Sequence, residues 1–384
     1  MANRFILNET SYFGAGAREN VATEIKARGL KKILFVTDKV LMEVGVATKV
    51  SDCLTNAGIP FDVYNEIKAN PTVKNVQDGV EKFKACGADA IVAVGGGSVI
   101  DTAKGIGVII TNPEFSDVVS LEGVADTKNK AVPIIALPTT SGTAAEVTIN
   151  YVITDEVNKK KMVCVDPHDI PVVAVVDSEL MMGMPKGLCA STGMDALTHA
   201  IEGFITPGAW ELSDMVELRA IELIAASLFD SVNGDPKARE TMALAQYVAG
   251  MGFSNVGLGI VHSMAHPLGA FYDTPHGVAN ALLLPYVLEY NAESSAKPKY
   301  RAIAKAMGVS NTESMTDDEA VKAAIDAVIA LSISIGIPQK LNEINVKEED
   351  FEDLSHAAFN DVCTGGNPRQ TSPEEIFEIY KKAF

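Results

Sequence analysis

The first half of the chain alternates short, uninterrupted apolar segments with longer amphipathic ones. Two of the amphipathic segments, residues 41–57 and 73–86, have the length of helices. Short strands that are apolar throughout are buried on both faces, which is typical of a parallel sheet covered by helices. The sequence therefore predicts an α/β domain with a parallel, Rossmann-like sheet. Its expected strands are residues 33–37, 61–64, 90–94, 133–137 and 172–177.

After Pro185 the pattern changes, and apolar residues recur at helical spacing over long stretches. This favours an all-helical second domain. A chain of 384 residues is long enough for two domains at about 100–200 residues each. We therefore expect domains at 1–185 and 186–384. Expected helices in the second are residues 188–205, 214–232, 238–254 and 317–335.

The balance of charges limits the kinds of partner. The formal net charge is −18, which repels nucleic-acid phosphates and anionic lipid headgroups. No apolar segment reaches the roughly 18–20 residues that span a bilayer, and the first residues do not resemble a secretory signal. Five scattered cysteines without a CxxC pair fit reduced thiols. We expect a cytoplasmic protein without nucleic-acid or membrane partners.

Two glycine- and hydroxyl-rich turns follow strands of the predicted sheet. The first contains Gly95, Gly96, Gly97 and Ser98, and glycines there let the backbone approach a phosphate at a helix N-terminus. The alternative is a tight turn with a Ser98/Asp101 capping box.

The second turn contains Thr139, Thr140 and Thr143, and a Thr143/Glu146 capping box there predicts a following helix. The carboxyl ends of parallel strands meet at one sheet edge, so the two turns together predict a dinucleotide site.

Asp38 ends the first predicted strand. A carboxylate at this point can accept hydrogen bonds from both ribose hydroxyls and repels a 2′-phosphate, so it favours NAD over NADP. The alternative is a helix N-cap.

Four of the six histidines fall in two segments of the second half. Asp195 and His199 are four residues apart, as are His262 and His266, so each pair shares one helix face; His276 follows after a bend. Imidazoles and a carboxylate are ligands for a divalent first-row metal, and iron and zinc accept the same set. Spacing alone leaves open whether His266 or one of its neighbours is the non-ligand. The other two histidines, His168 and His356, are interpreted as structural or surface residues.

At these motifs, and along its whole length, the chain resembles the iron-containing (group III) alcohol dehydrogenases. Within that family it is most similar to the lactaldehyde reductases (1,2-propanediol oxidoreductases). The segments that carry the closer resemblance are residues 7–10, 146–155, 164–171, 250–259 and 361–369.

The resemblance implies an NAD-binding N-terminal domain, a helical metal-binding domain and a homodimer. It implies Fe(II) held by Asp195, His199, His262 and His276, with His266 beside the metal as a catalytic proton carrier. The nucleotide contacts that it implies, besides the glycine turn, are Asp38, Asn70, Gly97, Ser98, Thr139, Thr140, Thr143 and Lys161. Family-specific segments place Asn150, Phe253 and Cys363 in the substrate pocket.

These observations predict an NAD-dependent oxidoreductase that acts on a small alcohol or aldehyde, with lactaldehyde and 1,2-propanediol as the expected pair. Alternatives within the family are 1,3-propanediol and short primary alcohols. A lyase of the dehydroquinate-synthase type would need a cationic pocket, and the helical half offers few lysines or arginines beside its histidines. A non-haem iron oxygenase would leave the two turns unexplained, and a filament-forming module would not need the intact motifs.

Overall fold

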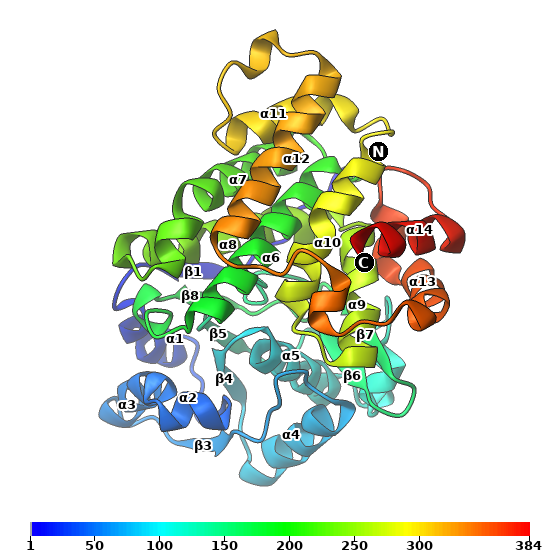
Figure 1. Ribbon diagram of the computed structural model, residues 1–384. Coiled ribbons are helices and arrows are strands. Elements are labelled where there is room, and N and C mark those ends of the chain that lie inside the picture. The colour runs from blue at the N-terminus through cyan, green and yellow to red at the C-terminus, as the bar shows by residue number, and fades with distance from the viewer. Residues whose placement is uncertain (1) are drawn as a thin grey trace. The chain divides into compact units, whose positions relative to one another are not determined.

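All five apolar segments that the sequence marks as strands lie in one parallel sheet. The computed structural model describes residues 2–384. The sheet has six strands in the order β1-β8-β5-β4-β2-β3, and every neighbouring pair is parallel (Figure 1). Its strands are β1 (Thr10–Phe13), β2 (Ile33–Val36), β3 (Phe61–Tyr64), β4 (Ala90–Gly95), β5 (Ile134–Pro138) and β8 (Val173–Val176).

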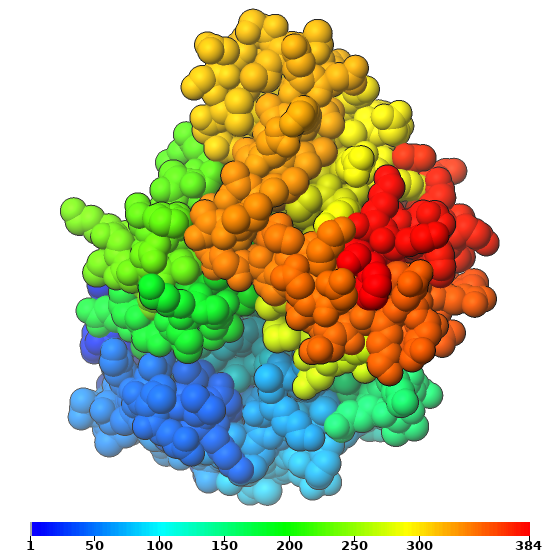
Figure 2. Space-filling view, in the orientation of Figure 1, coloured from blue at the N-terminus to red at the C-terminus, as the bar shows by residue number. Residues whose placement is uncertain are grey.

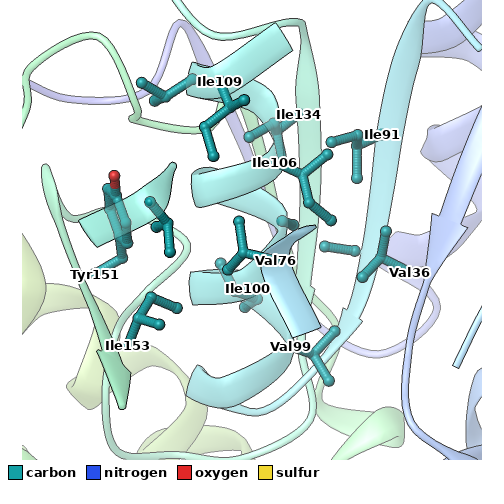
Figure 3. Close-up of a cluster of buried hydrophobic side chains, with 14 of the residues drawn as sticks. Val36, Val76, Ile91, Val99, Ile100, Ile106, Ile109, Ile134, Tyr151 and Ile153 are labelled. Carbon is teal, nitrogen blue, oxygen red and sulfur yellow. The ribbon is translucent and has the colours of Figure 1, made fainter. Parts of the chain in front are cut away.

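Helices cover both faces of this sheet, which explains why its strands are apolar throughout. In β2, Ile33 and Phe35 belong to one buried cluster, while Leu34 and Val36 belong to another on the opposite face. Figure 3 shows the second cluster, which packs around the buried helix α5. The helices are α1 (Val21–Ala27), α2 (Lys39–Glu43), α3 (Val46–Asn56), α4 (Val73–Cys86) and α5 (Gly97–Thr111).

Four features of this half differ from the sequence prediction. The helix expected at 41–57 is broken into α2 and α3 at Gly45, which has a φ of 77°. Strand β1 was not predicted, nor was the antiparallel hairpin of β6 (Asn150–Asp155) and β7 (Lys160–Val165). The helix expected after the second turn is wrong: Ala144 has a φ of 52°, which ends any helical path, and the chain makes a single turn before β6.

The second half is helical, and α6, α7 and α8 pack against one another. Its helices are α6 (Lys186–Ile205), α7 (Glu211–Val232), α8 (Pro236–Val256), α9 (Ile260–Tyr272), α10 (His276–Asn291), α11 (Tyr300–Ala306), α12 (Asp317–Ser334), α13 (Phe351–Phe359) and α14 (Pro373–Ala383). All four predicted helices are present, as α6, α7, α8 and α12.

The chain divides into two compact units. The first contains the residues up to Thr140 and Ala144–Met184, and the second contains Ser141–Thr143 and Pro185–Phe384. We call them the α/β unit and the helical unit. The three residues 141–143 therefore pack with helices that follow them by more than forty positions in the chain.

Among the described residues, no single helix is long and apolar enough to cross a membrane; α8 and α9 pass that test only as a pair bent by 103°. On the surface of the helical unit, α12 forms the orange ridge in Figure 2. A groove between α12 and α10 is lined by Tyr286, Val321 and Ile325, among others, and contains none of the predicted site residues.

Candidate metal centre

Three helices of the helical unit bring the four predicted metal ligands together. Helix α6 contributes Asp195 and His199, α9 contributes His262, and α10 begins at His276. One donor atom from each residue lies within 4.8 Å of the other three. Nitrogen and oxygen ligands lie roughly 2.0–2.2 Å from such metals, and a group of donor atoms this compact could hold one ion.

The histidine rings of this group contact one another directly. His199 stacks on His262 with ring centroids 4.5 Å apart, and His262 lies 5.4 Å from His276. Asp195, His199 and His262 are buried, while His276 is partly exposed. One edge of the cluster is therefore accessible.

The cluster contains a buried negative charge without an internal cation. Among the described residues, the ion pairs of Asp195 are with His199 and His276 alone. Burial lowers the pKa of His199 and lowers that of His262 well below its usual value, which favours the neutral form of both rings. A neutral imidazole does not balance the charge of a carboxylate, whereas a divalent cation would.

Asn280, one helical turn after His276, points its amide nitrogen at the same atoms. This nitrogen lies 2.7 Å from Asp195 Oδ1 and 3.1 Å from Nε2 of both His262 and His276. An amide carries two protons, so it cannot satisfy three acceptors. His199 Nδ1 is buried without a hydrogen-bond partner. Atoms that accept hydrogen bonds carry lone pairs, and the same lone pairs can bind a divalent metal. The surplus of hydrogen-bond acceptors is therefore the set of ligand atoms that such a metal needs.

Two further carboxylates bind the outer nitrogens of the histidines. Glu202 Oε2 lies 2.5 Å from His262 Nδ1, and Asp361 Oδ2 lies 2.8 Å from His266 Nδ1. His266 stacks on His276 at 5.3 Å and forms a second group with Asp361 and Cys363. The structure therefore places His266 beside the four-residue group.

The three residues predicted to line the substrate pocket lie in different units. Phe253 stacks on the His199 ring, with centroids 4.2 Å apart. Cys363, in a 3-10 helix at Val362–Gly366, donates its backbone N–H to Asp361 Oδ1, and burial raises its thiol pKa. Asn150 belongs to the α/β unit and begins β6.

In the α/β unit, the glycine turn joins β4 to α5. Gly96 is the N-cap of α5, and no side chain caps this helix end. A Cβ on Gly95 would lie 2.4 Å from the Val99 side chain, and one on Gly96 would lie 3.3 Å from Thr140. Thr139 donates its N–H to the Gly95 carbonyl at 3.0 Å, so the two turns are adjacent. A bare backbone at a helix N-terminus suits a phosphate.

Other predicted nucleotide contacts have partners within the α/β unit. Ser98 donates its hydroxyl to the Ala69 carbonyl, so the alternative capping box with Asp101 is not formed. Asp38 is the N-cap of α2 and accepts the Leu41 N–H at 2.8 Å, as its alternative interpretation predicted. Lys161 donates to Asn70 Oδ1 at 2.6 Å.

Three predicted residues lie elsewhere. Thr143 belongs to the helical unit, whereas Thr139 and Thr140 belong to the α/β unit. His168 is hydrogen-bonded to Thr127 at 2.9 Å, and His356 is exposed on α13, so neither joins the histidine cluster.

Sequence reasoning missed the residues behind the ligands. Glu202 follows His199 by three positions on α6, and Asn280 follows His276 by four on α10, so helical spacing could have identified both. Asp361 is 95 residues from His266, and nothing in the sequence pairs them.

Comparison with known proteins agrees with this geometry. Residues 8–178 match the family model "Iron-containing alcohol dehydrogenase", and residues 189–384 match "Fe-containing alcohol dehydrogenase family, C-terminal". The chain is 57% identical to lactaldehyde reductase of Escherichia coli K12 over 384 residues, which is 100% of both chains.

Solved structures show the same similarity. A crystal structure of 1,3-propanediol oxidoreductase superposes with a TM-score of 0.96 at 41% identity, covering 100% of both chains. Sulfoacetaldehyde reductase from Bifidobacterium kashiwanohense, solved in complex with NAD+, has a TM-score of 0.88 at 29% identity, covering 100% of this chain and 99% of that one. The protein belongs to the iron-containing alcohol dehydrogenase family.

Proposed function

We propose that the protein is a metal-dependent oxidoreductase that transfers a hydride between NAD(H) and a small alcohol or aldehyde. The observation that carries this proposal is the convergence of Asp195, His199, His262 and His276 on one buried point. The 57% identity to a lactaldehyde reductase supports lactaldehyde and 1,2-propanediol as the substrate pair. The similarity to a 1,3-propanediol oxidoreductase makes 1,3-propanediol the second candidate.

The four residues would hold Fe(II), and Zn(II) would accept the same nitrogen and oxygen donors. The unbalanced carboxylate and the surplus of acceptors around Asn280 support this assignment. Bound there, the metal would act as a Lewis acid on the substrate oxygen and lower the pKa of an alcohol.

The chain's own residues would orient the substrate and move its proton. His266 has its Nδ1 bonded to Asp361, so Nε2 is the ring nitrogen that can take up or release a proton. Phe253 covers the flat face of His199 and excludes water from that side of the site. With Cys363 and Asn150, Phe253 is proposed to line the substrate pocket.

The glycine turn would hold the NAD pyrophosphate with the first backbone N–H groups of α5. Nucleotide contacts are proposed for Asp38, Asn70, Gly95, Gly96, Gly97, Ser98, Thr139, Thr140, Thr143 and Lys161. NAD supplies the hydride acceptor when it is bound. We further propose that the α/β unit is the NAD-binding domain and the helical unit the catalytic domain of a cytoplasmic homodimer.

The decisive experiment measures NADH oxidation under anaerobic conditions with lactaldehyde as substrate. Chelator-treated protein is compared with protein reconstituted with Fe(II), and a parallel series uses 3-hydroxypropionaldehyde. Turnover that requires Fe(II) and is faster with lactaldehyde is the expected result. A protein that binds one metal and NAD but does not reduce lactaldehyde would overturn that substrate assignment.

A further inference from the structure

One buried carboxylate lies directly behind the histidine cluster. Glu202 is on α6, three residues after His199, and its side chain is 2% exposed. It does not belong to the group of four donor atoms. Its two oxygens instead face two different donors at the start of α9.

The first contact is with a histidine ring. Glu202 Oε2 lies 2.5 Å from His262 Nδ1. On its other side, His262 Nε2 lies 3.1 Å from the Asn280 amide nitrogen, which is a donor. A ring with an acceptor at Nδ1 and a donor at Nε2 carries its proton on Nδ1 and its lone pair on Nε2.

The second contact is with the backbone. Glu202 Oε1 accepts the Val261 N–H at 2.8 Å, within the first turn of α9. Gly259, the N-cap of α9, has no side chain that caps the helix. A carboxylate at a helix N-terminus is favoured by the helix dipole, so Glu202 caps α9 from a neighbouring helix. It does so together with Asn367 Oδ1, which accepts the Ile260 N–H at 3.3 Å.

The surrounding chain leaves room for this carboxylate. A Cβ on Gly259 would lie 2.8 Å from Glu202 Oε1. Any residue other than glycine at 259 would therefore push against the oxygen that accepts the Val261 N–H.

We infer that Glu202 is a positioning residue of the metal site: one carboxylate fixes both the start of α9 and the tautomer of His262, so that Nε2 presents its lone pair to the metal. This inference rests on the proposed metal-dependent function. Carboxylates that bind the outer nitrogen of a ligand histidine typically contribute about 10–100-fold to metal affinity.

The substitution Glu202→Gln tests the inference with little change of shape. An amide has one acceptor oxygen and one donor nitrogen, whereas the carboxylate has two acceptors. The amide nitrogen would therefore face either the Val261 N–H or the His262 Nδ1–H. In either arrangement two N–H donors would point at each other, which is unfavourable. The second arrangement shifts the ring proton to Nε2, where it blocks metal binding.

The experiment measures Co(II) affinity of the full-length protein by competition with a chelator at about pH 8, above the ordinary pKa values of carboxyl groups and histidines. The Co(II) visible spectrum reports the ligand geometry. Glu202→Gln is expected to weaken Co(II) binding by about 10–100-fold and to change the spectrum. Glu217→Gln is the matched control, because Glu217 on α7 is equally buried and has no hydrogen bond to a histidine. It is expected to bind Co(II) as the wild type does.

The outcomes separate this inference from the proposed function. Wild-type protein that does not bind Co(II) would refute the metal site itself. Wild-type binding together with an unchanged affinity and spectrum in Glu202→Gln would refute the role of Glu202 alone. If Glu202→Gln does not fold, ring ¹⁵N NMR of histidine-labelled metal-free wild type decides the question: a His262 proton on Nδ1 supports the inference, and a proton on Nε2 overturns it.

Discussion

The two units treat their buried polar groups in opposite ways. In the α/β unit, the fully buried Lys104 donates to Thr148 Oγ1 and to the carbonyls of Thr148 and Asn150, and lies 3.7 Å from Asp169. In the helical unit, Asp195 faces the rings of His199 and His276 and the Asn280 amide. The first unit places a lysine beside its buried Asp169, whereas no lysine or arginine among the described residues pairs with Asp195.

This difference teaches which part of the protein depends on a ligand. The candidate nucleotide residues Asp38, Ser98 and Lys161 have partners without a nucleotide. In the proposed metal site, the Asn280 amide nitrogen faces three polar atoms, which a cation from outside would bind. We therefore expect substitutions in the helical site to abolish ligand binding, and substitutions in the α/β unit to change stability or selectivity.

The largest effect is expected for His262→Ala. This change removes a central donor and should abolish metal retention and lower turnover by about 1000-fold or more, because the Lewis acid is lost with its ligand. Metal analysis and an NADH assay on the same preparation measure both losses. His356→Ala, at an exposed histidine outside the cluster, is the control. A fully active, metal-free His262→Ala would contradict the assignment.

A large effect on stability alone is expected for Lys104→Met. The change leaves three oxygens without their donor and buried carboxylates without their cation, which should cost about 3–5 kcal/mol of unfolding free energy. Urea unfolding measures the loss, and metal content should stay unchanged. Adding Asp169→Asn should recover part of it. A Lys104→Met protein as stable as the wild type would show that Lys104 does not stabilise the α/β unit.

The substitution Asp38→Ser tests whether Asp38 selects the nucleotide or only caps α2. Serine can still cap α2, so stability should change by less than about 0.5 kcal/mol. The carboxylate that would bind the ribose is lost, and we expect the preference for NAD over NADP to fall by about 10-fold. Steady-state kinetics with both cofactors measure this ratio. Asp38→Ala, which also loses the cap, should lower the free energy of unfolding by about 1 kcal/mol. An unchanged cofactor ratio in Asp38→Ser would leave Asp38 as a helix cap alone.

The smallest effect concerns Asp101, which follows the glycine turn on α5. Burial raises its pKa to about 6, against about 3.9 in an unfolded chain. Between about pH 5.5 and 7.5 the carboxyl is already ionised in the unfolded chain and becomes ionised in the folded one. The wild type should therefore lose about 1 kcal/mol relative to Asp101→Asn as the pH rises through this window. Urea unfolding at both pH values measures the difference, and parallel pH profiles would contradict it.

The sequence predicted those helices and strands whose pattern of apolar residues is visible within one continuous segment. The apolar segments of the sheet and the amphipathic helix at 73–86 carry their own signal, and the structure confirms both. Strand β1 (Thr-Ser-Tyr-Phe) is partly polar because it lies at the sheet edge, so its sequence lacks the continuous apolar pattern of the internal strands. The helix expected after the second turn failed because the positive φ of Ala144 is not visible in residue type.

The site divides in the same way. Helical spacing predicted that Asp195 lies beside His199 and His262 beside His266. It could not predict that Glu202 binds a residue 60 positions away, or Asp361 one 95 positions away, because such contacts depend on how the helices pack. The chemistry of the residue types predicted the candidate ligands, and it did not predict the carboxylates of Glu202 and Asp361 that contact the histidines.

Residues 141–143 have a consequence for engineering the protein. They belong to the helical unit although the α/β unit continues on both sides of them, and a Cβ on Gly142 would lie 2.7 Å from the Thr192 side chain on α6. A chimera joined at 184/185 would therefore combine α6 from one parent with residues 141–143 from the other. Those three residues would then pack against a helix from a different protein. Recombination between relatives should succeed more often when these three residues are inherited together with the helices, as a second, internal crossover.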